Sequence, residues 1–270
     1  MKYLKYFGFM LSIFLFVSCS STTEPSAEDE LVSILEQSKK SLDSAVTIIF
    51  DDASKAGTKI LAGNYDESLI RSELKAILAK HSTVLEVVFV NDKSVMTYVE
   101  PSTYKSSEGV DISTQEHQIE MTTKNKNAMS GIFKLVENFY GVVIASPIIN
   151  NGKYAGSVNV VIRPDYFISF YTDKYVKDKF DDSWVMETNG NILHDTDPTQ
   201  TGRNLFTDSL YLPYPTLITA GNTIVNGDSG KTNYSFLDKS KNKNVTKDVW
   251  WRTSTFFNKV WKLSIVKERI

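Results

Sequence analysis

Apolar residues recur at helical spacing in the first part of the chain. The stripe consists of Leu31, Ile34, Leu35, Leu42, Val46 and Ile49. Such spacing predicts an amphipathic helix. We expect it to start near Ser26 and to run to about Ala56, because Gly57 and Gly63 then interrupt the pattern. A second stripe predicts another helix over residues 66–80.

The apolar period then changes to two, which is typical of half-buried strands. The strands that we predict here are 84–90, 94–100, 133–137, 140–149 and 154–163. The Asn-Asn-Gly sequence at 150–152 indicates a hairpin turn, because Asn and Gly accept positive φ. Residues 104–126 are polar and predict no clear element. Together the five strands predict one antiparallel sheet, packed by the preceding helices.

A similar set of strands follows a helix that starts at Pro164 and Asp165. The predicted strands are 184–187, 192–195, 231–237, 249–256 and 260–267. Residues 210–222 indicate helical segments interrupted by prolines, and residues 239–247 indicate a charged, exposed hairpin loop. The chain therefore predicts an α+β fold. A long N-terminal helix is followed by two tandem modules, each a roughly five-stranded antiparallel sheet with helices.

The N-terminus has the order of an export signal: Lys2 and Lys5, a short apolar run, and small residues before Cys19. The apolar run is shorter than the ~20 residues that span a bilayer. Its ending, Phe-Val-Ser-Cys, resembles a bacterial lipobox, in which the cysteine is acylated after cleavage. The alternatives are an ordinary signal peptide or a buried core cysteine. We predict a lipoprotein signal over 1–18, a flexible tether over 19–27, and an extracytoplasmic location.

Composition narrows the classes of partner. The formal charge is −2 over 270 residues, and removal of the signal leaves 28 basic and 32 acidic residues, a charge of −4. No basic block is present, so nucleic acid is not favoured as a partner. The single cysteine leaves no thiol for a disulfide, and the hydrophobic content of 41% is that of a globular protein.

Several segments together resemble Cache domains, which are PAS-like extracellular sensor domains. In the second module these segments are Trp-Val-Met-Glu-Thr-Asn-Gly-Asn-Ile-Leu-His-Asp at 184–195, Asp-Pro at 197–198, Gly-Arg-Asn-Leu-Phe at 202–206, and the predicted last two strands at 250–253 and 261–266. In the first module the corresponding segment is 147–158. Two such modules behind a long helix resemble the double-Cache arrangement over about residues 28–268. The resemblance implies a membrane-distal module at 28–168 and a second Cache-like module at 169–270.

The sequence departs from most double-Cache proteins in two ways. No apolar segment long enough to span a membrane follows the last strand. The Arg-x-Trp-Tyr type signature of amino-acid-binding members is absent, since residues 129–134 read Met-Ser-Gly-Ile-Phe-Lys. The missing signature disfavours an amino acid as the ligand. We therefore expect a lipid-anchored sensor or binding protein that recognises a small molecule. It would signal in trans to a membrane partner.

The resemblance implies a ligand in the membrane-distal module, cupped between the sheet and the overlying loops. The aromatic residues on or near its strands are Phe89, Tyr98, Tyr104, Phe139 and Tyr140, and we predict these as ligand contacts. Plain core packing is the alternative for each. In the second module, strand alternation places Trp250 and Trp251 on opposite faces, with one of them in the core.

Catalytic chemistry has little support in the sequence. No Gly-x-Ser-x-Gly motif occurs, and no spacing singles out a catalytic triad. His194, Asp195 and Asp197 could ligate a cation, but Asp residues in turns commonly cap their own backbone amides, and we favour that interpretation. Arg203 could bind a ligand carboxylate, although an ion pair with Asp195 or Asp197 is favoured.

We expect no enzyme activity, metal or cofactor. The alternatives are a ligand-free structural envelope lipoprotein or an envelope hydrolase.

Cys19 provides the first test. Several acyl chains anchor a protein stably, whereas one gives only marginal binding. We expect Cys19→Ala to accumulate as uncleaved precursor or as soluble protein. The measurement is detergent phase partition together with the mass of the mature N-terminus. Normal processing and detergent-phase partition of this variant would disprove the lipoprotein prediction.

Overall fold

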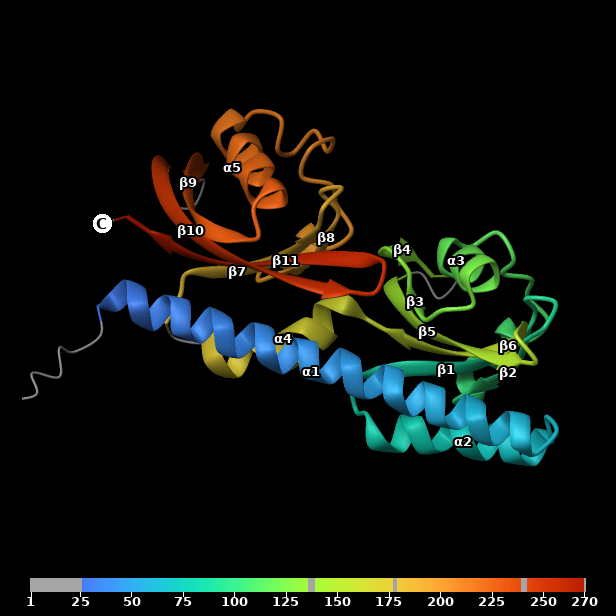
Figure 1. The fold of residues 1–270 in the computed structure, drawn as a ribbon. Coiled ribbons are helices and arrows are strands. Elements are labelled where there is room, and N and C mark those ends of the chain that lie inside the picture. The colour runs from blue at the N-terminus through green and yellow to red at the C-terminus, as the bar shows by residue number, and fades with distance from the viewer. Residues whose placement is uncertain (1–25, 136–138, 177–178, 239–241, 270) are drawn as a thin grey trace, which may run out of the picture.

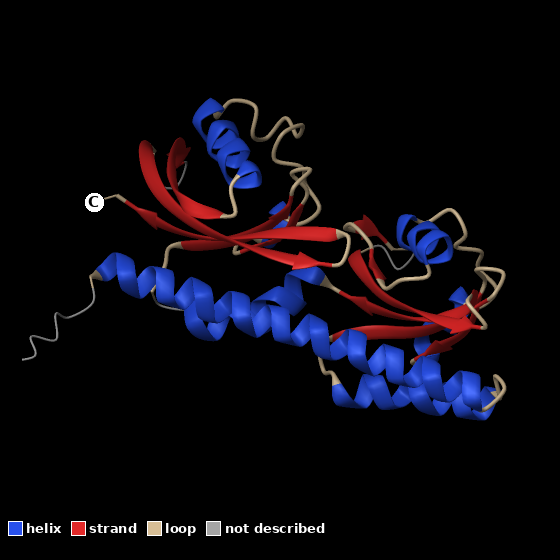
Figure 2. Cartoon of the chain, in the orientation of Figure 1, coloured by secondary structure: helices blue, strands red, loops and turns tan. Residues whose placement is uncertain are grey.

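A computed structural model describes residues 26–135, 139–176, 179–238 and 242–269. Its helices are α1 (Ala27–Ala62), α2 (Glu67–Lys80), α3 (Glu116–Lys124), α4 (Pro164–Val176) and α5 (Pro215–Asn226). Two antiparallel sheets follow one another along α1 (Figure 1). Helices α1, α2 and α4 lie on one side of the sheets, and α3 and α5 lie on the other side (Figure 2). Cys19 and most of the predicted tether lie outside the described residues.

The first sheet is built from the strands predicted before residue 164. Its members are β1 (Val84–Asn91), β2 (Met96–Glu100), β3 (Ala128–Met129), β4 (Phe133–Lys134), β5 (Tyr140–Asn150) and β6 (Lys153–Ile162). The order is β2-β1-β6-β5-β3, and β4 pairs separately with β5. Asn151 and Gly152 turn β5 into β6 with φ of +50° and +78°. The segment without a prediction, 104–126, contains α3 and part of a 3₁₀ helix, Ser102–Ser107.

The second sheet is separate from the first. Its strands are β7 (Asp182–Glu187), β8 (Ile192–Asp195), β9 (Ser229–Asp238), β10 (Lys243–Phe256) and β11 (Lys259–Glu268), in the order β8-β7-β11-β10-β9. A 3₁₀ turn, Pro198–Gln200, lies in the loop after β8. Strand β10 begins inside the predicted loop 239–247, because Val245 is buried and pairs with Phe236 of β9. The predicted α+β fold of two tandem modules is confirmed.

Helix α1 is longer than its apolar stripe predicts. It begins at a capping box, in which Ser26 Oγ accepts the Asp29 N–H at 3.1 Å and the Asp29 carboxylate accepts the Ser26 N–H. It continues through Gly57 to Ala62. A Cβ at position 57 would lie 3.0 Å from Ile148 Cγ1 of β5, so glycine allows the helix to approach the sheet closely. This packing offsets the ~1 kcal/mol that glycine costs inside a helix.

One hydrophobic cluster runs along α1 and includes residues of both modules. Ile60, near the end of α1 that lies beside α2 (Figure 1), belongs to this cluster. Trp250 and Trp261 of the second sheet belong to the same cluster. Trp251 belongs to another cluster, on the opposite face of that sheet. The two adjacent tryptophans therefore face opposite ways as predicted, and both are buried. Among the described helices, none is long and apolar enough to cross a membrane.

This shared core predicts that the modules unfold together. All four tryptophans, Trp184, Trp250, Trp251 and Trp261, lie in the second module, so their fluorescence reports on that module. Ile60→Ala removes a fully buried side chain at the far end of α1 and should cost ~2–5 kcal/mol. We expect the tryptophan transition in urea to shift with the circular dichroism transition. The exposed Lys55→Ala is the control. A tryptophan transition unaffected by Ile60→Ala would show that the modules unfold independently.

Candidate ligand-binding cavities

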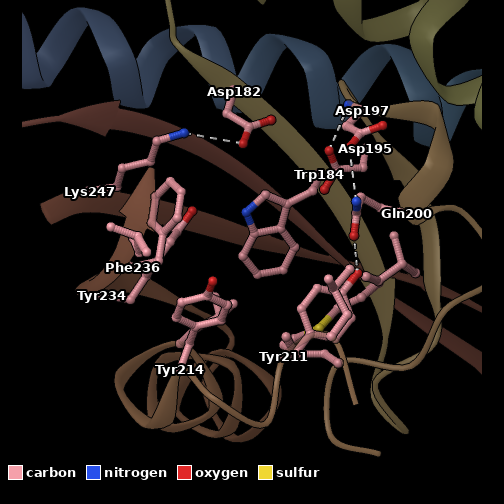
Figure 3. Close-up of a pocket in the computed structure, with 16 residues that line it drawn as sticks. Asp182, Trp184, Asp195, Asp197, Gln200, Tyr211, Tyr214, Tyr234, Phe236 and Lys247 are labelled. Atoms are coloured by element: carbon pink, nitrogen blue, oxygen red, sulfur yellow. Dashed lines mark hydrogen bonds and ion pairs between the residues drawn. The ribbon is translucent and has the colours of Figure 1, made fainter. Parts of the chain in front are cut away.

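Each module has a cavity on the sheet face that points away from α1. The second-module cavity has a volume of about 430 Å³ and is drawn in Figure 3. Alternation along β7 turns Asp182, Trp184 and Met186 towards it, and the pairing of Trp184 with Asp195 brings β8 to the same face. The remaining lining comes from β9, β10, the loop after β8 and the start of α5.

Acidic groups dominate the charge of this cavity. Lys247 Nζ lies 3.5 Å from an Asp182 carboxylate oxygen. Asp195 Oδ1 accepts the backbone N–H of Asp197 at 2.8 Å. Burial and the nearby charges of Asp182 and Asp197 together raise the pKa of Asp195 to about 8, while Lys247 opposes them. Tyr211 also faces this group, and its hydroxyl donates to Gln200.

The first-module cavity is smaller, about 220 Å³. Its walls are mostly apolar side chains: Val88, Met96, Val110, Ile112, Phe133, Leu135, Val143 and Val161. Glu86 of β1, Asn159 of β6 and His117 of α3 are buried polar residues in this lining. His117 is 1% exposed, and burial lowers its pKa to about 4, so the imidazole is neutral at pH 7. Its Nε2 lies 3.4 Å from Asn159 Nδ2, whereas Nδ1 has no hydrogen-bond partner among the described residues.

The five predicted ligand residues fall at three separate places, and none is in the lining of either cavity. Phe89 and Tyr98 stack with ring centroids 6.2 Å apart, and Arg71 of α2 lies over the Tyr98 ring. Tyr104 packs against an apolar cluster of β1 and β2. Phe139 lies under the Arg163 guanidinium at 5.6 Å, and the Tyr140 ring packs against Gly202 of the second module. Phe89 also borders a shallow surface depression. Their role as ligand contacts stays a prediction.

The loop after β8 is held by its own polar groups. Asp197 Oδ1 accepts the Thr199 N–H at 3.0 Å, so Asp195 and Asp197 both cap backbone amides, as the sequence favours. Arg203 donates to the Thr199 carbonyl and pairs with Asp208 at 2.9 Å, not with the predicted aspartates. Asp208 Oδ1 accepts the Leu210 N–H at 2.9 Å, and its Oδ2 accepts the Arg203 guanidinium. No group of three or more His, Cys, Asp or Glu residues in the described part of the chain could hold a metal ion.

Comparison with known proteins agrees with this architecture. Residues 38–164 match the family described as HK/GC/Chemotaxis protein-like, sensor domain. An extracellular ligand-binding receptor from Desulfohalobium retbaense is similar, with a TM-score of 0.72 and 19% identity over 89% of this chain. The chain spans only 40% of the length of that receptor. No curated protein sequence matches the chain.

Two chemoreceptor domains are similar over nearly their whole length. The ligand-binding domain of the Pseudomonas aeruginosa amino acid chemoreceptor PctB, in complex with L-Arg, has a TM-score of 0.63 and 14% identity over 90% of this chain and 95% of its own. That of the Pseudomonas fluorescens chemoreceptor CtaA, in complex with L-isoleucine, has a TM-score of 0.63 and 12% identity over 90% and 92%. At these identities the likeness establishes the fold. The resemblance to Cache-type extracellular sensor domains, in the double-Cache arrangement, is confirmed.

The raised pKa of Asp195 predicts a specific pH dependence. The folded state binds this proton more tightly than the unfolded state, whose pKa is near 3.9. The stabilisation is therefore complete below about pH 4 and is lost as the pH rises through about 8. Asp195→Asn stays neutral, so its free energy of unfolding relative to wild type should increase between about pH 5 and pH 9. Urea unfolding at several pH values measures this, with the exposed Asp228→Asn as control. Parallel pH profiles of wild type and Asp195→Asn would contradict the assignment.

Proposed function

We propose that this protein is an extracytoplasmic sensor that binds a small molecule in the first-module cavity. The observation that carries the proposal is the burial of Glu86, His117 and Asn159 in a mostly apolar lining, which also includes the polar residues Ser107, Gln115 and Lys134. Ligand sites are typically apolar with a few polar groups that fix the orientation of the ligand. A volume of about 220 Å³ is below the range of drug-sized sites, so we expect a small metabolite.

The three polar groups define the chemistry of the ligand. Glu86 offers a carboxyl group, whose oxygens accept hydrogen bonds, and the neutral His117 ring has one nitrogen without a partner among the described residues. Asn159 can donate and accept. A compact molecule with both hydrogen-bond donors and acceptors fits this set better than a purely apolar one. Such a ligand would satisfy His117 Nδ1, a buried atom without a hydrogen-bond partner among the described residues, which otherwise costs free energy.

The match of residues 38–164 to a sensor-domain family supports the sensing role. The relatives in complex with L-Arg and L-isoleucine support small-molecule recognition by this fold. Two cavities of about 220 and 430 Å³ favour a binding protein over a purely structural lipoprotein. We further propose a non-enzymatic protein, anchored through lipid on Cys19, that passes the signal in trans to a membrane protein. The sequence Phe-Val-Ser-Cys supports the anchor.

A thermal-shift screen of small metabolites against the mature protein tests this proposal. A ligand at a hundred times its dissociation constant adds ~2.7 kcal/mol to stability. That should raise the melting temperature by several degrees in a chain of this size. Glu86→Gln should abolish the shift of a first-module ligand and leave the fold intact, because the two side chains have nearly the same shape. Asp51→Asn, an exposed site on α1, is the matched control.

The same screen separates the cavity from the predicted aromatic contacts. We expect Tyr98→Ala and Tyr140→Ala to retain the ligand shift, since neither residue is in the lining of the cavity. Loss of the shift in these variants and its retention in Glu86→Gln would return the site to the aromatic residues. If no metabolite stabilises the wild-type protein, the sensing proposal is wrong and the structural alternative is favoured.

A further inference from the structure

The second-module cavity differs from the first in both size and chemistry. Aromatic rings form much of its wall: Trp184, Tyr211, Tyr214, Tyr234 and Phe236. Figure 3 shows Asp182, Asp195 and Asp197 along one edge of the cavity, with Tyr211 and Tyr214 on the opposite side of Trp184. Leu205, Leu210 and Leu217 add apolar surface beside the rings. The cavity thus has carboxyl groups along one edge and aromatic rings along its walls. Its volume of about 430 Å³ is large enough for a ligand of drug-like size.

The charges in this lining do not balance. Among the described residues of the lining, three carboxyl groups face one ammonium group, and that group, on Lys247, is already paired with Asp182 at 3.5 Å. Arg203, in the loop after β8, is bound to Asp208 and to the Thr199 carbonyl and is not in the lining, although its charge helps to lower the pKa of Asp197. Asp195 has a protein contact from the Asp197 amide through Oδ1 only, as far as the described residues show. An occupant with a positive charge would therefore stabilise the ionised form of Asp195 beside the other two carboxylates.

The walls add independent support for a cation. Tyr234 is 6% exposed, and its hydroxyl interacts with the Trp184 side chain within the lining. Trp184 is thereby fixed between the carboxylate edge and the other rings. The faces of Trp and Tyr rings carry partial negative charge and attract cations within about 6 Å of the ring centroid. Phe236 already has such a neighbour, because Lys247 Nζ lies 5.3 Å from its ring.

We propose that the second-module cavity is a distinct binding site for an organic cation, namely a primary ammonium group on an aromatic or apolar body. The ammonium group pairs with Asp195 and Asp182, and the body lies between Trp184 and Tyr214. This site is independent of the one in the first module. An anionic ligand is disfavoured, because Lys247, the one cationic side chain among the described residues of the lining, is paired with Asp182.

A coupled proton release follows from this geometry. In the empty cavity, burial and the neighbouring carboxylates raise the pKa of Asp195 to about 8, so this carboxyl is largely protonated at pH 7. A bound ammonium group favours the ionised carboxylate. Binding at pH 7 should therefore release up to about one proton per ligand, and the affinity should rise between pH 7 and pH 8.5 while the amine stays protonated.

Isothermal titration calorimetry with two cation probes, phenethylammonium and tyramine, tests the proposal on the mature protein. Their uncharged counterparts, 2-phenylethanol and tyrosol, are the ligand controls. We expect both cations to bind about tenfold or more tightly than their alcohols. Titration in buffers of different ionisation enthalpy counts the released protons. Equal binding of amines and alcohols, or no binding of either amine, would overturn the proposal.

Variants then place the site. Asp195→Asn should weaken phenethylammonium binding about tenfold or more and abolish proton release, and Tyr214→Leu should weaken binding by removing one ring. If Asp195→Asn does not fold, Asp182→Asn, which frees the Lys247 charge, should weaken binding as well. Asp228→Asn, an exposed carboxylate of the same module, is the matched control.

Glu86→Gln separates the two sites. It should leave phenethylammonium binding unchanged, although it abolishes binding in the first module. Loss of cation binding in Glu86→Gln, with retention in Asp195→Asn, would move the cation to the first-module cavity and refute a separate site. Failure of the metabolite screen would leave this result untouched, because the two experiments depend on different residues.

Discussion

The burial of one apolar stripe of α1 against both sheets is the constraint on which the rest of the structure depends. Ile34, Ile49 and Ile60 lie near the start, in the middle and near the end of that stripe. All three are buried in a single cluster that includes residues of both modules. Each sheet must therefore present one face to the helix layer. Because side chains alternate along a strand, the opposite face of each sheet is left for α3 or α5 and the loops beside them. Both cavities lie on that opposite face.

Much of this fold could be predicted from the sequence, because the relevant signals are local. Helix caps, strand alternation and the Asn-Gly turn all depend on neighbours a few residues apart. The end of α1 and the start of β10 were misplaced for a different reason. Gly57 is tolerated because Ile148, distant in sequence, requires a close approach, and Val245 is ordered by its pairing with Phe236. Tertiary contacts decided both positions.

The candidate sites were harder to predict than the fold. Aromatic residues on the first sheet gave a plausible set, but Phe89 and Tyr98 lie on the face towards α2, and Tyr140 lies against Gly202. The first-module cavity has a different signal in the sequence: Glu86 and Asn159 are polar residues with apolar neighbours on both sides in their strands. A buried polar group is costly without a partner, so its place in such a strand indicates a polar environment within the fold. His117 gave no such signal, because its segment had no predicted element and its burial depends on the packing of α3.

The contacts between the modules connect the two cavities. Asn258, in the turn between β10 and β11, donates to the Met129 carbonyl and accepts the Met129 N–H, at 3.1 and 2.9 Å. Lys259, the next residue, pairs with Glu116 at 2.5 Å. Glu116 directly precedes His117, which lines the first-module cavity. A displacement of α3 by a ligand would therefore act on the β10–β11 hairpin.

The hairpin carries this constraint to the second cavity. Lys247 and Trp251 lie on β10, one in the lining of the second-module cavity and the other in the apolar cluster beneath it. Both residues are held in register with β11 through continuous pairing from Lys247 to Phe256. A shift at the turn cannot be absorbed within such a ladder without breaking hydrogen bonds. Occupancy of either cavity thus bears on the same pair of strands, and linkage requires that any coupling between the two ligands be reciprocal.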